Sequence, residues 1–417
     1  METISQSEGP PPASPDLPQE LRLQVETSFA RLEPLREVWD EAALRLGGNV
    51  YMTFDWVRTW WESYGSKREL RLFLARVGDQ IVGLVPLFLE RLRFGPWTLQ
   101  VAKPLSVSLP PRLFCPPVAG EWAEAIFAQV LRHLFAEDHC DVLNFGPVCE
   151  LYPFKESFER ACQGSAGGRQ SFEKLDRGVH CLFSLPRNME DYYASLSKNE
   201  RKNRRKYELR LLKKEYDVQV EVCRDPALAE KEFEAFVAQH TAQWQAERKP
   251  GHFVAWPHGK EFNLALVRSQ SRAGRLRLIR IIANGQVISY QYAFVFGNTW
   301  YWELPSRRIG EQWERFSLGP SGIVTMIDLA IQEGMVKLEG GIGHYDYKVR
   351  LGGKELAVSG YRVVRAEGTS RGRVRLFDWI HRGLELVCHK IWYRRIHPLL
   401  PVSLRGAQPT AWLRYEF

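Results

Sequence analysis

The segment LEGGIGHYDYK at residues 338–348 concentrates side chains that can accept or donate a proton. Glu339 ends a predicted strand beside glycines, which let another molecule approach the backbone closely. Glu339 or His344 could serve as a general base, and Tyr345 or Tyr347 as a general acid. The alternative is a glycine-rich turn whose polar side chains face water, because clustered ionisable groups are often structural.

Lys348, the last residue of this segment, could bind a phosphate, a carboxylate or a developing oxyanion. A structural ion pair is the alternative for this lysine. Seven cysteines are scattered through the chain without metal-binding spacing, so we expect reduced, mostly buried thiols and no metal site.

A second candidate is the segment FSLGPSGIVTMIDLA, in which a Gly-Pro-Ser-Gly turn opens a predicted helix. The backbone N–H groups at such a helix start are unpaired and favour an anion such as a phosphate. Ser317 and Ser321 could add hydroxyl contacts, and Gly319 and Gly322 leave the backbone accessible. An ordinary helix start capped by serine is the alternative interpretation.

Further polar and aromatic side chains lie on two predicted strands at 287–296 and 299–304. Strand alternation sends Ser289 and Gln291 to one face and Tyr290 and Tyr292 to the other. Tyr290 or Gln291 could line a substrate site, although aromatic residues on strands usually pack in a core. Trp244, late in a predicted helix at 227–247, is a candidate wall of an acceptor site, with simple packing as the alternative.

The elements that must position these residues occur twice. Residues 71–85 and 275–290 each read as a β-hairpin, and six residues of one match six of the other in type and order. A helix-like stretch and a strand follow each hairpin, with Leu143 and Gly146 matching Leu338 and Gly341. The first copy has Asn144, Phe145 and Pro147 and no acid–base cluster, so any catalytic site is expected in the second copy.

The repeat predicts a mixed α/β (α+β) fold of two lobes, each a mostly antiparallel sheet flanked by helices. The predicted domains are a disordered Pro-rich tail at 1–21, lobes at 22–175 and 176–365, and an extension at 366–417. GSAGGRQS at 164–171 is the predicted linker. The chain has 417 residues, 45% hydrophobic and 25% charged, as in a globular protein, and no apolar run is long enough to span a membrane.

The net charge of +8 allows an anionic partner, and two segments carry much of it. The predicted helix at 196–214 begins with the capping pattern Ser197–Glu200 and places Lys198, Arg201, Lys202 and Arg205 on one face. Residues 371–397 hold seven Lys or Arg against two acids, with apolar residues at helical spacing. This amphipathic extension could pack on the lobes or lie on an anionic membrane surface.

Four segments together resemble the GNAT acyltransferase superfamily, and within it the cellulose-biosynthesis (CelD/BcsL-type) acetyltransferases. They are FDWVRTWWESYG, LSKNERKNRRKYELRLLKK, FSLGPSGIVTMIDLAIQEG and GGIGHYDYKVRLGG, and they span roughly residues 50–365. Fem-type aminoacyltransferases share paired GNAT-like lobes. The resemblance implies that the helix start at 317–322 binds the pyrophosphate of coenzyme A, with Arg308 in a partial match to the superfamily's phosphate motif.

The resemblance therefore implies a metal-independent, cytoplasmic acyltransferase that uses acetyl-CoA or another acyl-CoA. The expected acceptor is a small-molecule or glycan precursor, and peripheral attachment to the inner face of the membrane is possible through residues 371–397. Fem-type transfer from aminoacyl-tRNA is the alternative, and nucleic acid is expected only in that case. A non-catalytic GNAT-like scaffold is the third possibility.

Overall fold

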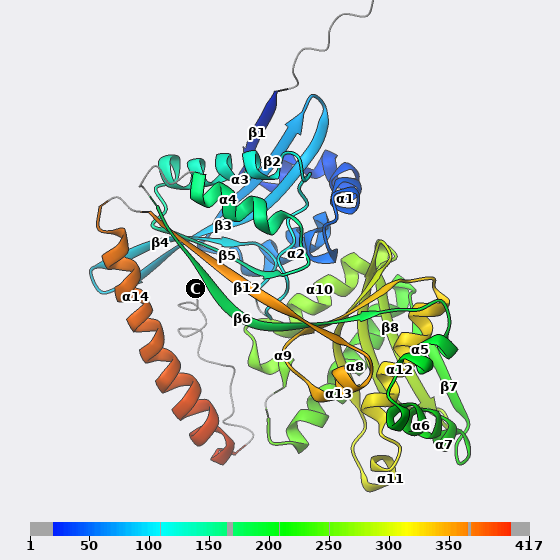
Figure 1. Ribbon diagram of the computed structural model, residues 1–417. Coiled ribbons are helices and arrows are strands. Elements are labelled where there is room, and N and C mark those ends of the chain that lie inside the picture. Colours follow the sequence, from blue (N-terminus) through cyan, green and yellow to red (C-terminus); the bar gives the residue numbers. More distant parts are fainter. Residues whose placement is uncertain are drawn as a thin grey trace, which may run out of the picture.

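The computed structural model describes residues 20–108, 110–164, 170–207, 209–249, 251–365 and 368–401 (Figure 1). Of the predicted tail at 1–21, only Glu20 and Leu21 are described, and Leu21 begins the first strand. Most of the predicted linker, residues 165–169, lies outside the described residues.

The elements of the first half alternate between strands and helices. In chain order they are β1 (Leu21–Glu26), η1 (Phe29–Arg31), η2 (Glu33–Leu35), α1 (Arg36–Arg45), η3 (Val50–Met52), α2 (Phe54–Tyr64), β2 (Glu69–Val77), β3 (Gln80–Phe94), β4 (Trp97–Pro104), α3 (Ala123–Arg132), η4 (His133–Glu137), β5 (Val142–Cys149) and α4 (Phe154–Gly164).

The second half repeats much of this order. Its elements are β6 (Gln170–Ser184), α5 (Met189–Ser195), α6 (Lys198–Tyr207), α7 (Arg210–Lys213), β7 (Val218–Cys223), α8 (Pro226–Ala246), α9 (His252–Ala255), α10 (Gly259–Arg272), β8 (Leu276–Ala283), β9 (Gln286–Phe296), β10 (Thr299–Arg307), α11 (Glu311–Glu314), α12 (Leu318–Gln332), β11 (Lys337–Ile342), α13 (Asp346–Arg350), β12 (Lys354–Arg365), α14 (Ser370–Leu384), η5 (Glu385–Ile396) and η6 (His397–Leu399).

The strands form one 12-stranded sheet in the order β1-β2-β3-β4-β5-β12-β6-β11-β10-β9-β8-β7. This order is symmetric about its centre, with each of β1 to β5 matched by one of β7 to β11. In each half a three-stranded antiparallel meander is followed by a helix and then by a strand parallel to the third. The two-lobe α/β fold predicted from the repeat is therefore confirmed. We call the half with β1–β5 the N-terminal lobe and the half with β7–β11 the C-terminal lobe.

Strands β6 and β12 join the two lobes at the centre of the sheet (Figure 1). They pair with each other from Gln170 to Leu182, while β12 also pairs with β5 and β6 with β11. The predicted boundary between residues 175 and 176 falls inside β6. A strand of this length needs no loop there, and the sheet runs through the junction without a break.

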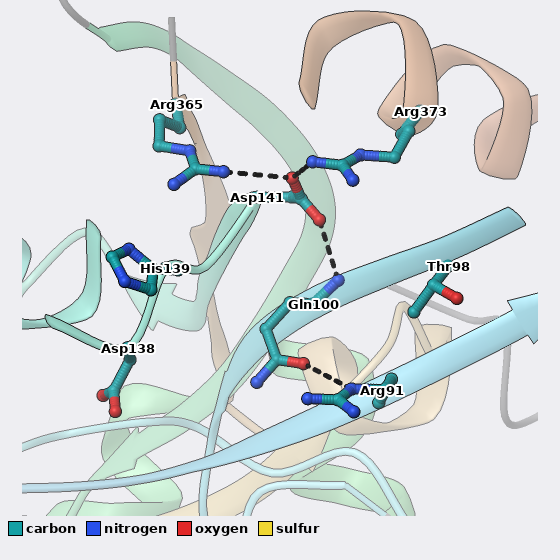
Figure 2. Close-up of a pocket in the computed structure, with 8 residues that line it drawn as sticks. All are labelled: Arg91, Thr98, Gln100, Asp138, His139, Asp141, Arg365 and Arg373. Atoms are coloured by element: carbon teal, nitrogen blue, oxygen red, sulfur yellow. Dashed lines mark hydrogen bonds and ion pairs between the residues drawn. The ribbon is translucent and has the colours of Figure 1, made fainter. Parts of the chain in front are cut away.

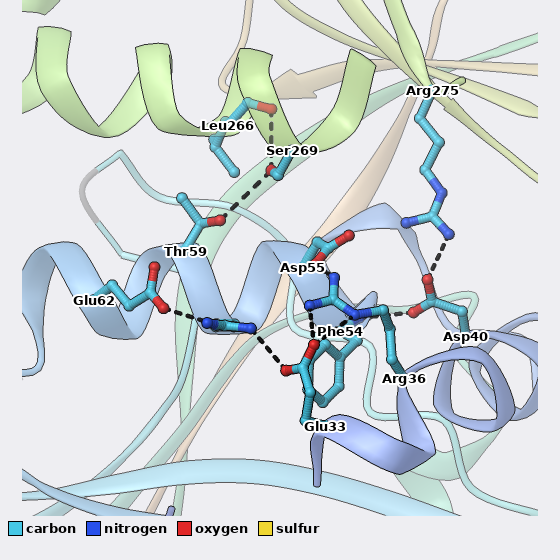
Figure 3. Close-up of polar contacts among 11 residues, drawn as sticks. Glu33, Arg36, Asp40, Phe54, Asp55, Thr59, Glu62, Leu266, Ser269 and Arg275 are labelled. Carbon is cyan, nitrogen blue, oxygen red and sulfur yellow. Dashed lines mark hydrogen bonds and ion pairs between the residues drawn. The ribbon is translucent and has the colours of Figure 1, made fainter. Parts of the chain in front are cut away.

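The lobes also share a hydrophobic core. Trp56 of α2 contacts Phe294 of β9 edge to face, with ring centroids 4.9 Å apart. Tyr51 contacts Tyr301 in the same way at 5.6 Å. The α2 surface packs against α10 of the other lobe, where Thr59 and Ser269 lie within 3.5 Å (Figure 3). Large aromatic contacts of this kind fix the orientation of one lobe on the other.

Polar contacts reinforce the junction near α1, where Arg275, directly before β8, pairs with Asp40 at 2.5 Å (Figure 3).

All seven cysteines are unpaired, and five of them are buried. Among the helices in the described part of the chain, none combines the length and apolar composition needed to cross a bilayer.

Candidate active site

The parallel strands β10 and β11 of the C-terminal lobe pair over only three positions. The last pair is Tyr301 with Glu339, although β10 continues to Arg307 and β11 to Ile342. A register shift on β10 between Trp302 and Leu304 accompanies the separation. The strands therefore diverge beyond Tyr301, and a gap opens in the sheet with Trp302 and Gly340 at its start.

Two glycines at the end of β11 turn the chain back toward this gap. Gly341 and Gly343 have φ values of +82° and +112°, which a side chain would strain. The reversal leads into the short helix α13, and Lys348 on that helix is buried. Its Nζ donates to the carbonyl oxygen of Gly340 at 2.5 Å. The glycine-rich segment thus places one ammonium group at the start of the gap.

Aromatic rings form the rest of the surroundings of Lys348. Its Nζ lies 4.4 Å from the ring centroid of Tyr345 and 5.2 Å from that of Trp302. Within the described residues, no carboxylate lies at ion-pair distance from Nζ. Burial lowers the pKa of Lys348 to about 8, because the charged form is poorly solvated there. The predicted structural ion pair is therefore not found, and the ammonium keeps donor capacity for an anionic ligand or oxyanion.

Trp302 adds a second donor to this gap. Its indole Nε1 is buried and has no hydrogen-bond partner in the part of the chain that the structure describes. An unpaired buried N–H is costly and rare, so it calls for an explanation. The indole N–H of Trp302 is therefore a second donor, beside the Lys348 ammonium 5.2 Å from its ring centroid, that a bound acceptor could satisfy.

Glu339 lies on the opposite face of β11. Strand alternation points it away from Leu338 and Gly340, and its Oε2 lies 3.2 Å from Nε2 of the buried His180 on β6. Burial, and after it the charge of Glu339, raise the pKa values of Tyr152 and Tyr301 well above the ordinary range. Glu339 therefore faces the N-terminal lobe, across the sheet from Lys348.

His344 lies at the surface, with 63% of its side chain exposed. Its Nδ1 is 2.6 Å from Glu355 and its Nε2 is 3.1 Å from Asp346. The hydrogen bond to Glu355 raises the pKa of His344, which favours an imidazolium that cannot accept a proton. Of the predicted acid–base residues, Tyr345 lies at the gap beside Lys348. Tyr347 contacts the ring of Tyr345, with ring centroids 5.7 Å apart.

The predicted phosphate-binding segment forms the first turn of α12 itself. Ser317 precedes the helix in a left-handed conformation, and a side chain at Gly319 would meet open space. Ser321 and Gly322 instead face inward. Ser321 donates to the carbonyl oxygen of Phe316 at 3.3 Å, and a Cβ at Gly322 would lie 2.2 Å from Gln291. Ser317 and Gly319 are thus the two that border accessible space.

Two features limit this helix start as an anion site. Pro320 in the first turn has no backbone N–H to donate. Arg308, on the loop between β10 and α11, donates through Nε to the carbonyl oxygen of Val287 at 2.7 Å, although its side chain is exposed. The segment retains backbone donors at Leu318 and Gly319, which suffices for a phosphate contact but not for an extended cradle.

The other predicted substrate residues lie in separate clusters. Trp244 packs at the end of α8 against His252, with ring centroids 5.0 Å apart. Tyr290 packs against Phe236 of α8 and is buried, while Gln291 faces α12 on the other side of β9. The predicted alternation along β9 is confirmed. Packing, the alternative raised for Trp244 and Tyr290, matches their positions, and the role predicted for Gln291 stays a prediction.

The corresponding gap in the N-terminal lobe is closed by the chain itself. β4 and β5 pair at only two positions, Val101–Val142 and Ala102–Leu143. The connection after β4 then fills the space, since Phe114 donates its N–H to Pro147 of β5 at 2.7 Å. Its ring packs against Phe145 at 5.0 Å. From the same connection Arg112 reaches the other lobe and pairs with Glu303 of β10 at 2.7 Å, both buried.

The predicted basic helix at 196–214 is two helices, α6 and α7, because Leu209 adopts a left-handed conformation. The predicted cap is present, with Ser197 Oγ accepting from the N–H of Glu200 at 3.2 Å. Arg201 donates to the carbonyl oxygens of Ala194 and Leu196 at the end of α5. Part of the positive face therefore serves local structure.

Sequence reasoning missed His180, Arg112 and the partnerless indole of Trp302. Nothing in the sequence links His180 to Glu339, because their strands meet only through long-range antiparallel pairing. Within the described residues, no cluster of three or more His, Cys, Asp or Glu side chains could hold a metal ion.

Residues 198–349 match a family model described as an acetyltransferase (GNAT) domain. The match covers α12, β11 and Lys348. Comparison with curated protein sequences gives no significant match.

Among solved structures, FemX is similar with a TM-score of 0.59 and 9% identity over 83% of this chain and 98% of that one. A conserved protein of unknown function from Bacteroides thetaiotaomicron VPI-5482 gives a TM-score of 0.49 and 11% identity, over 82% and 100%. A tandem GNAT protein from the clavulanic acid biosynthesis pathway gives 0.40 and 12%, over 84% and 99%. Residues 198–349 of the C-terminal half therefore match the model of a GNAT acetyltransferase domain, and the chain as a whole shares the fold of FemX.

Proposed function

We propose that the protein transfers an acyl group from an acyl-CoA, with acetyl-CoA as the first donor to test, to an amine or hydroxyl of a sugar or other cell-envelope precursor. One observation carries the proposal. Lys348 is a buried ammonium without a carboxylate partner in the described chain, and it lies where β10 and β11 separate. Burying an ammonium group without an ionic partner costs free energy, and groups of this kind cluster at functional sites. We therefore assign Lys348 the role of stabilising a negative charge that develops during the reaction.

The chemistry assigns this charge to the thioester oxygen. The acceptor nitrogen or oxygen attacks the carbonyl carbon, a new C–N or C–O bond forms, and the carbonyl oxygen becomes an oxyanion. Lys348 Nζ and Trp302 Nε1 donate hydrogen bonds to that oxyanion. The C–S bond then breaks, the thiolate takes up a proton, and the acceptor loses one to a base. Tyr345 is our candidate acid, and Glu339 with His180, reached through the gap from the other face, our candidate base.

The first turn of α12 would hold a phosphate of the donor. Gly319 borders open space and Ser317 makes no capping bond, so both could contact an anion at the positive end of the helix dipole. The cellulose-biosynthesis branch remains our proposal for the acceptor class, resting on the four sequence segments that resemble it.

Transfer from aminoacyl-tRNA is the second candidate, favoured by Lys198 and Lys202 on the outer part of α6. Lys202 is exposed, while Arg201 has a structural partner. This candidate predicts tRNA binding that weakens steeply with salt, and no response to coenzyme A.

A thermal-shift titration with acetyl-CoA, longer acyl-CoAs and free CoA tests the donor. Ligand at about a hundred times its Kd should stabilise the native state by about 2.7 kcal/mol, a shift of a few degrees. Gly319→Glu, which adds a carboxylate beside the donor phosphate, should weaken this response, whereas Gly372→Glu on α14 should not. No shift with any acyl-CoA, together with salt-sensitive tRNA binding, would replace this proposal with the second candidate. A response to neither would leave the scaffold.

A further inference from the structure

The C-terminal extension forms a long helical rod whose first half packs on the N-terminal lobe. Val374, Phe377 and Ile380 of α14 are buried against a patch of the sheet. That patch is made by Leu92 and Leu99 of the β3–β4 hairpin with Val101, Val142 and Val364. The predicted apolar stripe is therefore divided, since Ile380 is buried whereas Val387 and Ile391 further along the rod are exposed.

A buried carboxylate fixes the base of this rod (Figure 2). Asp141, 3% exposed, accepts hydrogen bonds from the backbone N–H of Gln100 at 2.9 Å and from Ser370 Oγ at 2.6 Å. Arg373 of α14 and Arg365 at the end of β12 also pair with it. Because these bonds come from β4, β12 and α14, they hold the start of the rod at one angle to the lobe.

The outer face of α14 is basic and carries a tryptophan. Arg371, Arg375, Trp379 and Arg382 follow at i, i+4, i+8 and i+11, which places them on one side of an α-helix. All four are exposed, and Trp379 is 73% exposed. A soluble surface seldom leaves tryptophan this accessible without a partner.

Five apolar side chains continue this face into η5. They are 39% to 56% exposed and are Leu386, Val387, Ile391, Trp392 and Ile396. η5 is a π-helix, in which i→i+5 bonding places residues four and five apart on the same side. The five residues form two adjacent pairs, at 386–387 and 391–392, followed by Ile396, and each group begins five residues after the one before. The π-helical repeat therefore stacks the groups on one side of the rod, whereas an α-helix would spread them.

The positive charges beside the apolar stripe indicate which kind of partner fits this surface. Lys390, Arg394 and Arg395 are exposed next to it, and with three arginines on α14 they give the rod six exposed cations. Of its two acids, Asp378 is paired with Arg362 at 2.9 Å. We propose that this rod, Arg371 to Ile396, docks on the surface of an anionic phospholipid bilayer, with the apolar stripe and Trp379 in the interface and the cations on lipid phosphates.

Co-sedimentation of the full chain with vesicles of phosphatidylcholine alone, or mixed with phosphatidylglycerol, tests this proposal. We expect binding to the mixed vesicles that falls with salt. Arg375→Glu with Arg382→Glu should reduce the partition coefficient by about fivefold or more for each charge. Trp379→Ser with Leu386→Ser should reduce it by on the order of tenfold.

Matched controls lie on α8, where Leu228→Ser and Lys231→Glu change an exposed leucine and an exposed lysine. They should leave vesicle binding and, like the test variants, the melting temperature unchanged. Failure of the wild-type chain to bind mixed vesicles, or equal binding by test and control variants, overturns the proposal. So does concentration-dependent dimerisation in sedimentation velocity that Trp379→Ser with Leu386→Ser abolishes, because the stripe would then meet a second copy.

Discussion

The two lobes repeat one fold, yet their equivalent gaps have opposite contents. Between β4 and β5 the N-terminal lobe inserts its own connection, and Phe114 packs there against Phe145. Between β10 and β11 the C-terminal lobe places Lys348 and an indole N–H that has no hydrogen-bond partner among the described residues. The gap of the N-terminal lobe is thus filled by packed side chains, whereas the gap of the C-terminal lobe contains polar groups. The chemistry of each lobe therefore depends on the side chains placed on the fold, and the shared fold does not determine it.

The closed gap also has a role in the open one. Arg112, carried by the connection that fills the first gap, pairs with Glu303 on the strand that borders the second. Its guanidinium also lies 5.1 Å from the ring centroid of Trp56. The N-terminal lobe therefore acts on the site as a support that fixes β10.

Breaking that support should have the largest effect. Arg112→Met leaves Glu303 buried without its partner, so we expect a loss of about 3–5 kcal/mol in the free energy of unfolding, measured by urea denaturation. Adding Glu303→Leu should recover most of this loss. Arg268→Met, which removes an exposed pair with Glu230, should cost less than about 1 kcal/mol. Similar losses in Arg112→Met and Arg268→Met would show that the lobes do not depend on the buried pair.

Removing the cation of the open gap should abolish most activity. Lys348→Met is expected to lower kcat by about 10²–10³, as loss of an oxyanion donor does. Its melting temperature should stay equal or rise, because a buried unpaired charge is removed. Lys354→Met, at an exposed position at the start of β12, should keep full turnover. Undiminished turnover in Lys348→Met would remove Lys348 from the reaction.

The same lysine predicts a dependence of stability on pH. Its pKa is about 8 when folded and about 10.5 when unfolded, so the unfolded chain binds more protons between these values and stability rises with pH across that window. The full effect is about 3 kcal/mol. The stability advantage of Lys348→Met over wild type should be largest below pH 8 and should shrink toward pH 10.5. Turnover should fall as the ammonium deprotonates above pH 8.

His344 should matter least. It is exposed and paired with two carboxylates, so His344→Ala is expected to change kcat by less than about threefold, within the range of surface substitutions. A loss in kcat as large as that of Lys348→Met would contradict the placement of the chemistry inside the gap.

Much of the fold could be predicted from the sequence. The paired hairpins at 71–85 and 275–290 predicted the repeat, since local turn and strand signals need no long-range information. The extent of β6 across the predicted boundary could not be recognised, because its pairing with β11 and β12 depends on segments roughly 150 to 195 residues further along the chain. The basic helix was predicted as one because the left-handed Leu209 leaves no mark on helical periodicity.

The sequence predicted which segment forms the site, but it did not predict where the individual side chains of that segment point. LEGGIGHYDYK contains Lys348 and Tyr345, which meet at the gap, but strand alternation puts Glu339 on the other face and leaves His344 in solvent. The direction of the side chains in this segment is set by the positive φ angles of Gly341 and Gly343, which sequence spacing does not reveal. Lys348 is buried and has no carboxylate partner in the part of the chain that the structure describes, and this could be recognised only from the structure.

Hydrogen–deuterium exchange with and without a saturating acyl-CoA tests the contrast between the two gaps most directly. We predict protection at residues 317–322 and 339–349 of the C-terminal lobe, with no change at 110–118 and 142–149 of the N-terminal lobe. Protection confined to the N-terminal lobe, or none in the C-terminal lobe at ligand concentrations that saturate turnover, would contradict the assignment of acyl transfer to the Lys348 gap.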